Sequence, residues 1–96
     1  MRVTWDERKN GSNQRKHGLS FETATLVFDD PLHISVKDRE VDGEARWQTI
    51  GMVGGIMMLL VVHTVENKDE DEEEAVRIIS ARKPTPQERR TYAQAN

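Results

Sequence analysis

The apolar residues change their spacing along this 96-residue chain, from sparse clusters in the first third to runs rich in β-branched residues afterwards. Such runs, separated by turn-forming or polar segments, are typical of strands. We predict strands at residues 33–37, 46–53, 56–65 and 75–82. A Gly54–Gly55 pair between the second and third runs predicts a tight hairpin, and short connections favour an antiparallel meander.

The first third is predicted to begin with a short strand at residues 1–5, followed by a helix over residues 7–17. Asp6 is a typical N-cap for this helix, and Gly18 can adopt the left-handed conformation that ends it. The helix contains no large apolar residue, so core packing alone cannot hold it. We expect Trp5 and Phe21 to anchor its ends.

Two further helices are predicted from their capping residues. Ser20 can cap a short second helix, which residues 29–31 (DDP) should stop. Thr85, a proline at the first helical position and Glu88 form a capping-box pattern for a final helix over residues 86–95. The predicted fold class is therefore α+β: an antiparallel meander sheet with two N-terminal helices and one C-terminal helix.

The first helix carries a cationic stripe. Helical spacing puts Lys9, Asn13, Lys16 and His17 on one of its faces. Two interpretations remain open, a solvated surface helix and a stripe that binds phosphate groups.

The composition limits the class of protein. Apolar residues make up only 35% of the chain, which predicts one domain over residues 1–96 with a thin core. Cysteine is absent, which excludes a disulfide scaffold and a thiolate zinc site. The opening MRVTWDERKN has no signal-like apolar core, and the longest apolar run, residues 56–62, is far shorter than the about 20 residues of a membrane span. We expect a cytoplasmic protein without membrane association.

The net charge of −3 is unevenly distributed. Residues 66–74 (ENKDEDEEE) carry −6, so the rest of the chain carries +3. A block this dense in like charge predicts an acidic solvated loop. The alternative is a functional role, in which the loop shields a basic surface by imitating phosphate.

The histidines do not form a metal-binding pattern. His17, His33 and His63 are scattered, and none has a second histidine at helical metal spacing. The chain also lacks a nucleotide-binding glycine loop. We therefore predict no metal and no cofactor. His63, embedded in LLVVH, is interpreted equally well as a buried core histidine or as a catalytic one.

Cationic residues gather near the C-terminus, with a tyrosine close behind. They are Arg77, Arg82, Lys83, Arg89 and Arg90, followed by Tyr92. Arginine forks bind phosphate and can stabilise the charge of a phosphorane-like transition state. The alternative is that the strand arginines are paired with Glu44 or Glu88. Strand alternation adds that Arg77 and Arg82 share a face only if a bulge or the strand end re-aims one of them.

Motifs over nearly the whole chain resemble the BrnT-type toxins, in the same order. They are W-D-x-x-K-x-x-x-N-x-x-K-H-G-x-x-F from Trp5 to Phe21, D-P-L, E-x-R-W-x-x-I-G from Glu44, V-V-H-T ending at Thr64, and R-I-I-S-A-R-x-x-T-x-x-E-R-x-x-Y from Arg77 to Tyr92. The resemblance implies the toxin of a type II toxin–antitoxin pair, a metal-independent ribonuclease with a RelE-like fold. It also implies a BrnA-like antitoxin as partner, RNA as substrate, contact with operator DNA only through the antitoxin, and a toxin–antitoxin hetero-oligomer.

These observations lead to an endoribonuclease hypothesis. The candidate catalytic residues are His17, Glu44, Arg46, His63, Arg77, Arg82 and Tyr92. The candidate RNA-binding residues are Lys9, Asn13, Lys16, Lys83 and Arg89. In this hypothesis the arginines bind phosphate, His17 or His63 transfers a proton, Tyr92 assists as a donor, and Glu44 acts as a base or orients an arginine. The alternative is a non-enzymatic nucleic-acid-binding module that uses the same cations.

Overall fold

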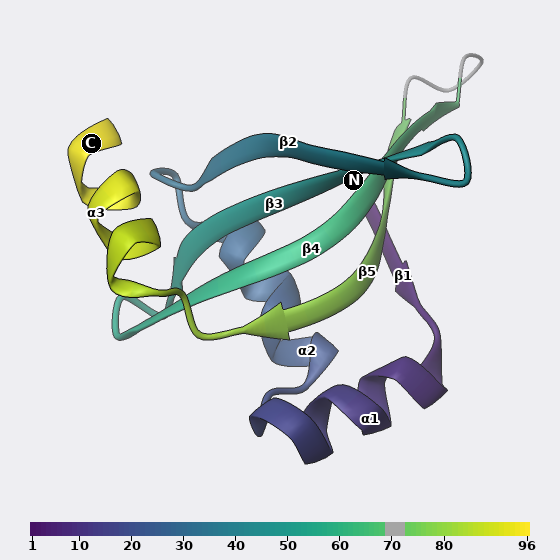
Figure 1. Cartoon of the computed structure of the whole chain (residues 1–96), viewed down its shortest axis with the longest axis horizontal. Coiled ribbons are helices and arrows are strands. Elements are labelled where there is room, and N and C mark those ends of the chain that lie inside the picture. The colour runs from purple at the N-terminus through teal and green to yellow at the C-terminus, as the bar shows by residue number, and fades with distance from the viewer. Residues whose placement is uncertain (69–72) are drawn as a thin grey trace.

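A five-stranded sheet organises the computed structural model, which describes residues 1–68 and 73–96 (Figure 1). The elements are β1 (Arg2–Trp5), α1 (Glu7–His17), α2 (Phe21–Ala24), the 3-10 helix η1 (Thr25–Asp29), β2 (Ile34–Val41), β3 (Glu44–Val53), β4 (Met57–Lys68), β5 (Glu73–Arg82) and α3 (Pro86–Ala95). In the described part of the chain, no helix is long and apolar enough to cross a membrane.

The strand order is β1-β5-β4-β3-β2. Strands β2 to β5 form the predicted antiparallel meander, but β1 pairs in parallel with β5 at one edge, so the sheet as a whole is not a simple meander. From β1, the segment of α1, α2 and η1 carries the chain to β2 at the opposite edge of the sheet. The α+β class is confirmed.

The helix boundaries follow the capping residues. The Asp6 carboxylate accepts a hydrogen bond from the Arg8 amide, and Gly18 ends α1 with φ of 71°. Thr85 and Glu88 form the predicted capping box of α3. The second predicted helix differs: α2 lasts only one turn before the chain tightens into η1.

The first face of the sheet, here called the helix face, packs against α1, α2 and η1 (Figure 1). Its buried core contains Leu19, Phe21, Ala24, Val27, Leu59, Val61, Ile78 and Ala81. Trp5 meets Phe21 edge to face, with ring centroids 6.3 Å apart, which confirms the anchoring of α1 at this point. Gly51 allows η1 to approach closely, because a Cβ there would lie 2.8 Å from the Val27 carbonyl oxygen.

The opposite face of the sheet is covered only in part, by α3. Tyr92 packs there against Ile50 and Leu60, and four partly buried apolar side chains extend this smaller core. They are Ile34, Met52, Met58 and Val62. The apolar content is thus divided between two thin cores, and much of this face is left to polar side chains.

Strands extend into both ends of the predicted acidic loop at 66–74. Strand β4 continues to Lys68 and β5 begins at Glu73, and the rest of the predicted loop, residues 69–72, lies outside the described residues. Cross-strand pairing of Glu66 with Ala75 extends the hairpin further than the charge pattern indicates.

Candidate functional site

A bulge in β5 determines which arginines face the same way. Val62 pairs with Ser80 and His63 pairs with Ile78, so Ile79 is an extra residue without a partner on β4. As a result Arg77 lies opposite Thr64 and Arg82 lies opposite Leu60.

Directly opposed residues of an antiparallel pair project from the same face, and Leu60 and Thr64 share a face of β4 because four residues separate them. Both Arg77 and Arg82 therefore project from the face that α3 partly covers. The same alternation along β3 puts Glu44 and Arg46 there as well. We call this surface the arginine face.

Glu44 is the centre of a charged cluster on this face. Its Oε1 accepts a hydrogen bond from Arg77 Nη2 at 2.6 Å and lies 4.0 Å from Arg46 Nη2. One carboxylate therefore holds two guanidinium groups that come from different strands. The Arg46 side chain is only 19% exposed, and its buried Nε has no hydrogen-bond partner among the described residues.

A small polar cavity adjoins the Glu44 cluster. It has a volume of about 130 Å³, and its polar lining includes Arg2, Thr4, Thr64 and Glu66 in addition to Glu44 and Arg77. The turn before β3 helps to position Glu44, because Asp42 and Gly43 both have positive φ values, 52° and 78°. These six side chains come from four strands that only the folded sheet brings together.

Arg82 is held at the other end of the arginine face by α3. Its guanidinium donates to both carboxylate oxygens of Glu88, at 2.7 and 2.9 Å. The Arg82 hydrogen bonds lower the pKa of Glu88 to about 2, and the same pairing raises the pKa of Arg82. The pairing of the strand arginines with Glu44 and Glu88, expected as the alternative to a catalytic role, is thus what the structure shows. These pairs orient the guanidinium groups.

Tyr92 does not face the arginines with its hydroxyl group, so its predicted role as an assisting proton donor is wrong. The hydroxyl donates to Asp30 Oδ2 at 2.6 Å, where it is buried. This hydrogen bond and burial raise the pKa of Tyr92 to about 12. The Tyr92 and Met52 hydrogen bonds lower the pKa of Asp30. Tyr92 therefore ties α3 to the end of η1.

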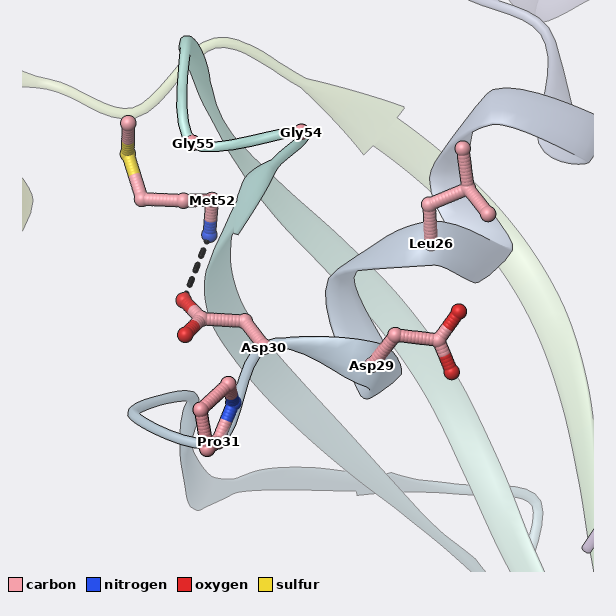
Figure 2. A pocket seen from close by; sticks show the side chains of 7 residues that line it. All are labelled: Leu26, Asp29, Asp30, Pro31, Met52, Gly54 and Gly55. Atoms are coloured by element: carbon pink, nitrogen blue, oxygen red, sulfur yellow. Dashed lines mark hydrogen bonds between the residues drawn. The ribbon is translucent and has the colours of Figure 1, made fainter.

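A hollow of about 480 Å³ lies beside Asp30, between η1 and the β3–β4 turn (Figure 2). Figure 2 shows the Asp30 carboxylate turned toward the Met52 amide, which donates to it at 2.8 Å, while Asp29 points away. The lining contains no cationic side chain. Asp30 is already bonded to three donors, so its carboxylate is not free for catalysis.

His63 lies on the helix face, opposite the arginines, so it cannot share their site. It is 2% exposed, and burial lowers its pKa. Its Nε2 is 2.6 Å from Thr49 Oγ1, and its Nδ1 is 3.1 Å from the Thr64 carbonyl oxygen. The interpretation of His63 as a buried core histidine is the one that the structure supports. His63 is therefore not placed to act as a catalytic group beside the arginines.

Asn13 is likewise part of the scaffold and not an RNA ligand. Its amide group bonds to both the N–H and the carbonyl of Ala81, at 3.1 and 2.9 Å, and donates to the Leu19 carbonyl at 2.9 Å. Asn10, also buried, accepts from the Phe21 amide and donates to Glu22. These two asparagines explain how a helix without a large apolar residue is held in place, which the sequence analysis missed.

The remaining cations of α1 are accessible. Lys9, Lys16 and His17 line a cleft of about 280 Å³ together with Ile79 and Ser80 of the β5 bulge. Ser80 lies opposite Val62, on the arginine face. The cleft therefore adjoins that face at the C-terminal end of β5. Lys83 and Arg89 are exposed beyond this end. In the described part of the chain, no three His, Cys, Asp or Glu side chains are grouped to hold a metal ion.

Comparison with known proteins adds a family to this geometry. A family model described as "Ribonuclease toxin, BrnT, of type II toxin-antitoxin system" matches residues 5–88. The crystal structure of the Brucella abortus ribonuclease toxin BrnT aligns with a TM-score of 0.60 and 24% identity, over 88% of this chain and 97% of that one. At this identity the structural likeness shows a shared fold. None of the curated protein sequences matches the chain.

Proposed function

The chain belongs to the BrnT family of ribonuclease toxins of type II toxin–antitoxin systems, and we propose that it cuts RNA on the arginine face of its sheet. The observation that supports this location is the Glu44 carboxylate, which holds Arg77 at 2.6 Å and Arg46 at 4.0 Å. The β5 bulge puts Arg82 on the same face. Arg46 and Arg77 thus meet at one end of this face, where they suit one phosphate, and Arg82 lies at its other end, where it suits another phosphate of the same strand.

In the proposed reaction, Arg46 and Arg77 bind the scissile phosphate. Glu44 takes the proton of the neighbouring 2′-hydroxyl, and the 2′-oxygen attacks phosphorus. A new bond forms from phosphorus to the 2′-oxygen and the bond to the 5′-oxygen breaks, with a proton from water going to the leaving oxygen. The products are a 2′,3′-cyclic phosphate and a 5′-hydroxyl. The guanidinium groups stabilise the additional negative charge on the phosphorane-like transition state.

The Nε of Arg46, which has no hydrogen-bond partner in the part of the chain that the structure describes, supports this role. A buried guanidinium N–H without a partner costs free energy unless a ligand accepts its hydrogen bond. A phosphate oxygen at the Glu44 cluster would supply that acceptor. Because these groups are oriented before RNA arrives, little reorganisation is needed in the transition state.

The cleft of α1 extends the proposed RNA path. Lys9, Lys16 and His17 would bind the phosphate backbone where the strand leaves the arginine face near Ser80. Lys83 and Arg89 would contribute at the same end. Because His17 is exposed in this cleft and not at the Glu44 cluster, we assign it to RNA binding rather than to proton transfer.

A type II system also supplies an antitoxin protein. We infer that a BrnA-like antitoxin covers the arginine face, forms a hetero-oligomer with the toxin and alone contacts operator DNA. We place the cleavage reaction in the cytoplasm, where the RNA is.

A Glu44→Gln variant tests the reaction. Purified protein should cut RNA in the presence of EDTA, because arginines and not a metal ion supply the positive charge in the proposed reaction. The products should carry 2′,3′-cyclic phosphate ends. Glu44→Gln should still bind RNA but cut at least about a hundredfold more slowly. Unchanged cleavage by a folded Glu44→Gln, or cleavage abolished by EDTA, would refute the proposed chemistry. RNA binding without products in the wild type would favour the non-enzymatic alternative.

A further inference from the structure

A second cavity, of about 500 Å³, opens on the helix face beside η1, on the other side of the sheet from the Glu44 cluster. Its size is in the range of small-ligand sites. Its chemistry comes mainly from aromatic and polar side chains, namely Phe28, His33, Ser35, Trp47, His63 and Glu74. We call it the base pocket. Register supports its place on this face, because Trp47 lies opposite His63.

The rings of the base pocket are fixed by edge-to-face contacts. The Phe28 ring meets His63 with a centroid separation of 5.2 Å and meets His33 at 6.3 Å. Trp47 lines the same cavity. Aromatic walls of this kind favour a flat, conjugated ligand that can stack or make edge contacts.

Hydrogen bonds fix the tautomers of the two histidines. The His63 Nδ1 faces the Thr64 carbonyl, which only accepts, so Nδ1 carries the proton and Nε2 accepts from the Thr49 hydroxyl. Thr49 in turn accepts from the Ser35 hydroxyl at 2.6 Å. Both ring nitrogens of His63 are thus occupied, and the residue serves as a wall of the pocket.

Two side chains of the pocket can hydrogen-bond to the polar edge of a ligand. His33 Nδ1 donates to the Asp30 carbonyl at 2.7 Å, so a ligand would meet the other ring nitrogen, Nε2. Glu74 contributes a carboxylate, which accepts only. A ligand that satisfies Glu74 must carry N–H donors, and the aromatic walls favour donors at the edge of a flat ring.

We propose that the base pocket binds a guanine base. Guanine is the nucleobase that presents two adjacent N–H donors, N1–H and the N2 amino group, on its Watson–Crick edge, and a carboxylate accepts such a pair in bidentate fashion. The corresponding edge of adenine, cytosine or uracil offers a single donor group. Glu74 would read this edge while Phe28 and Trp47 contact the ring.

The pocket is within reach of the RNA path, and this part of the inference rests on the proposed function. Met1 lines the base pocket, whereas the next residue, Arg2, lines the polar cavity beside Glu44. Val76 lines both cavities, so they lie back to back across the edge formed by β1 and β5. An RNA strand that passes over this edge would place a base in the pocket and a phosphate at Arg77.

The test is calorimetric titration of the whole chain with guanosine, inosine and adenosine. Guanosine should bind about tenfold or more tightly than adenosine, with inosine, which lacks the amino group, in between. Glu74→Gln should weaken guanosine binding by about tenfold or more, while Glu40→Gln, which changes an exposed carboxylate of β2, should not. Equal affinity for guanosine and adenosine, no binding, or unchanged binding by Glu74→Gln would overturn the proposal.

An Arg77→Ala variant separates this inference from the proposed function. Guanosine binding should survive in Arg77→Ala even though RNA cleavage is lost. If wild type does not bind guanosine while Arg77→Ala still loses cleavage, the base pocket is wrong and the cleavage site stands. If guanosine binds as expected while Arg77→Ala cuts normally, the cleavage site is wrong and the base pocket stands.

Discussion

Arg77 and Arg82 project from the same face of β5 although they are five positions apart, because the unpaired Ile79 shifts the register between them. Regular alternation would put them on opposite faces. The bulge therefore assembles a row of guanidinium groups along one surface, with a carboxylate partner at each end.

Substitutions of the paired residues Arg82 and Glu88 should have different effects on RNA cleavage. Arg82→Ala should slow RNA cleavage by about tenfold or more, because it removes a cation from the proposed phosphate-binding face. Glu88→Gln retains that cation and should largely preserve cleavage. Cleavage assays on both purified variants make the comparison. An Arg82→Ala protein that cuts as fast as wild type would exclude Arg82 from the site.

The lowered pKa of Glu88 also predicts that part of the folding stability is lost in acid. Its pKa is about 2 in the folded protein against an ordinary value of 4.5, so the folded state favours the charged form. This contribution is fully present above about pH 4.5 and is lost as the pH falls toward 2. Glu88→Gln should lower the free energy of unfolding at pH 7 by about 1 kcal/mol, a value reduced for the partial exposure of the pair, and by less at pH 3. Urea unfolding at the two pH values measures this difference. An equal loss at both would contradict the assignment.

The raised pKa of Tyr92 predicts a contribution to folding stability that is lost in alkali. Its pKa is raised to about 12 from 10, so the folded state favours the neutral phenol, and this stabilisation is present below pH 10 and lost as the pH rises through 12. Because Tyr92 is the sole tyrosine, tyrosinate absorbance reports its ionisation directly. Tyr92→Phe should cost about 1.5 to 3 kcal/mol at pH 7 while RNA cleavage persists. A midpoint near 10 in the folded protein would show that the Asp30 hydrogen bond is not formed.

Asn13 and Lys9 lie on the same helix, but substitution of Asn13 should affect stability and substitution of Lys9 should affect RNA binding. Asn13→Ala leaves the Ala81 amide and two buried carbonyl groups without their partner, and should cost roughly 2 to 5 kcal/mol in thermal or urea unfolding. Lys9→Ala should leave stability within about 0.5 kcal/mol of wild type but weaken RNA binding and reduce its salt dependence. If Asn13→Ala proves as stable as Lys9→Ala, the docking of α1 has been assigned to the wrong residue.

The sequence predicted most elements because strand runs and helix caps are local signals. The Thr85–Glu88 box and Gly18 needed no tertiary information. The position of β1 could not be predicted, since a four-residue strand does not specify its partner.

The errors in the candidate site have a related cause. The role of Asn13 depends on Ala81, 68 residues away, and that of Tyr92 depends on Asp30, 62 residues away. Residue type indicated that these polar side chains could belong to a functional site. It did not indicate the backbone group or carboxylate with which each would form a hydrogen bond. Arg77 and Arg82 were recognised as candidates, and strand alternation required either a bulge or the strand end to bring them to one face. Only the register showed that the bulge is at Ile79.

The central claim is that RNA is cut on the arginine face, and the cleavage rate of Arg77→Ala measures it most directly. The matched control is Arg39→Ala, which removes an exposed arginine from β2, and circular dichroism should show that both variants are folded. With the same RNA and EDTA present, Arg77→Ala should cut about a hundredfold or more slowly than wild type, and Arg39→Ala should cut at the wild-type rate. A folded Arg77→Ala that cuts as fast as the control would contradict the account.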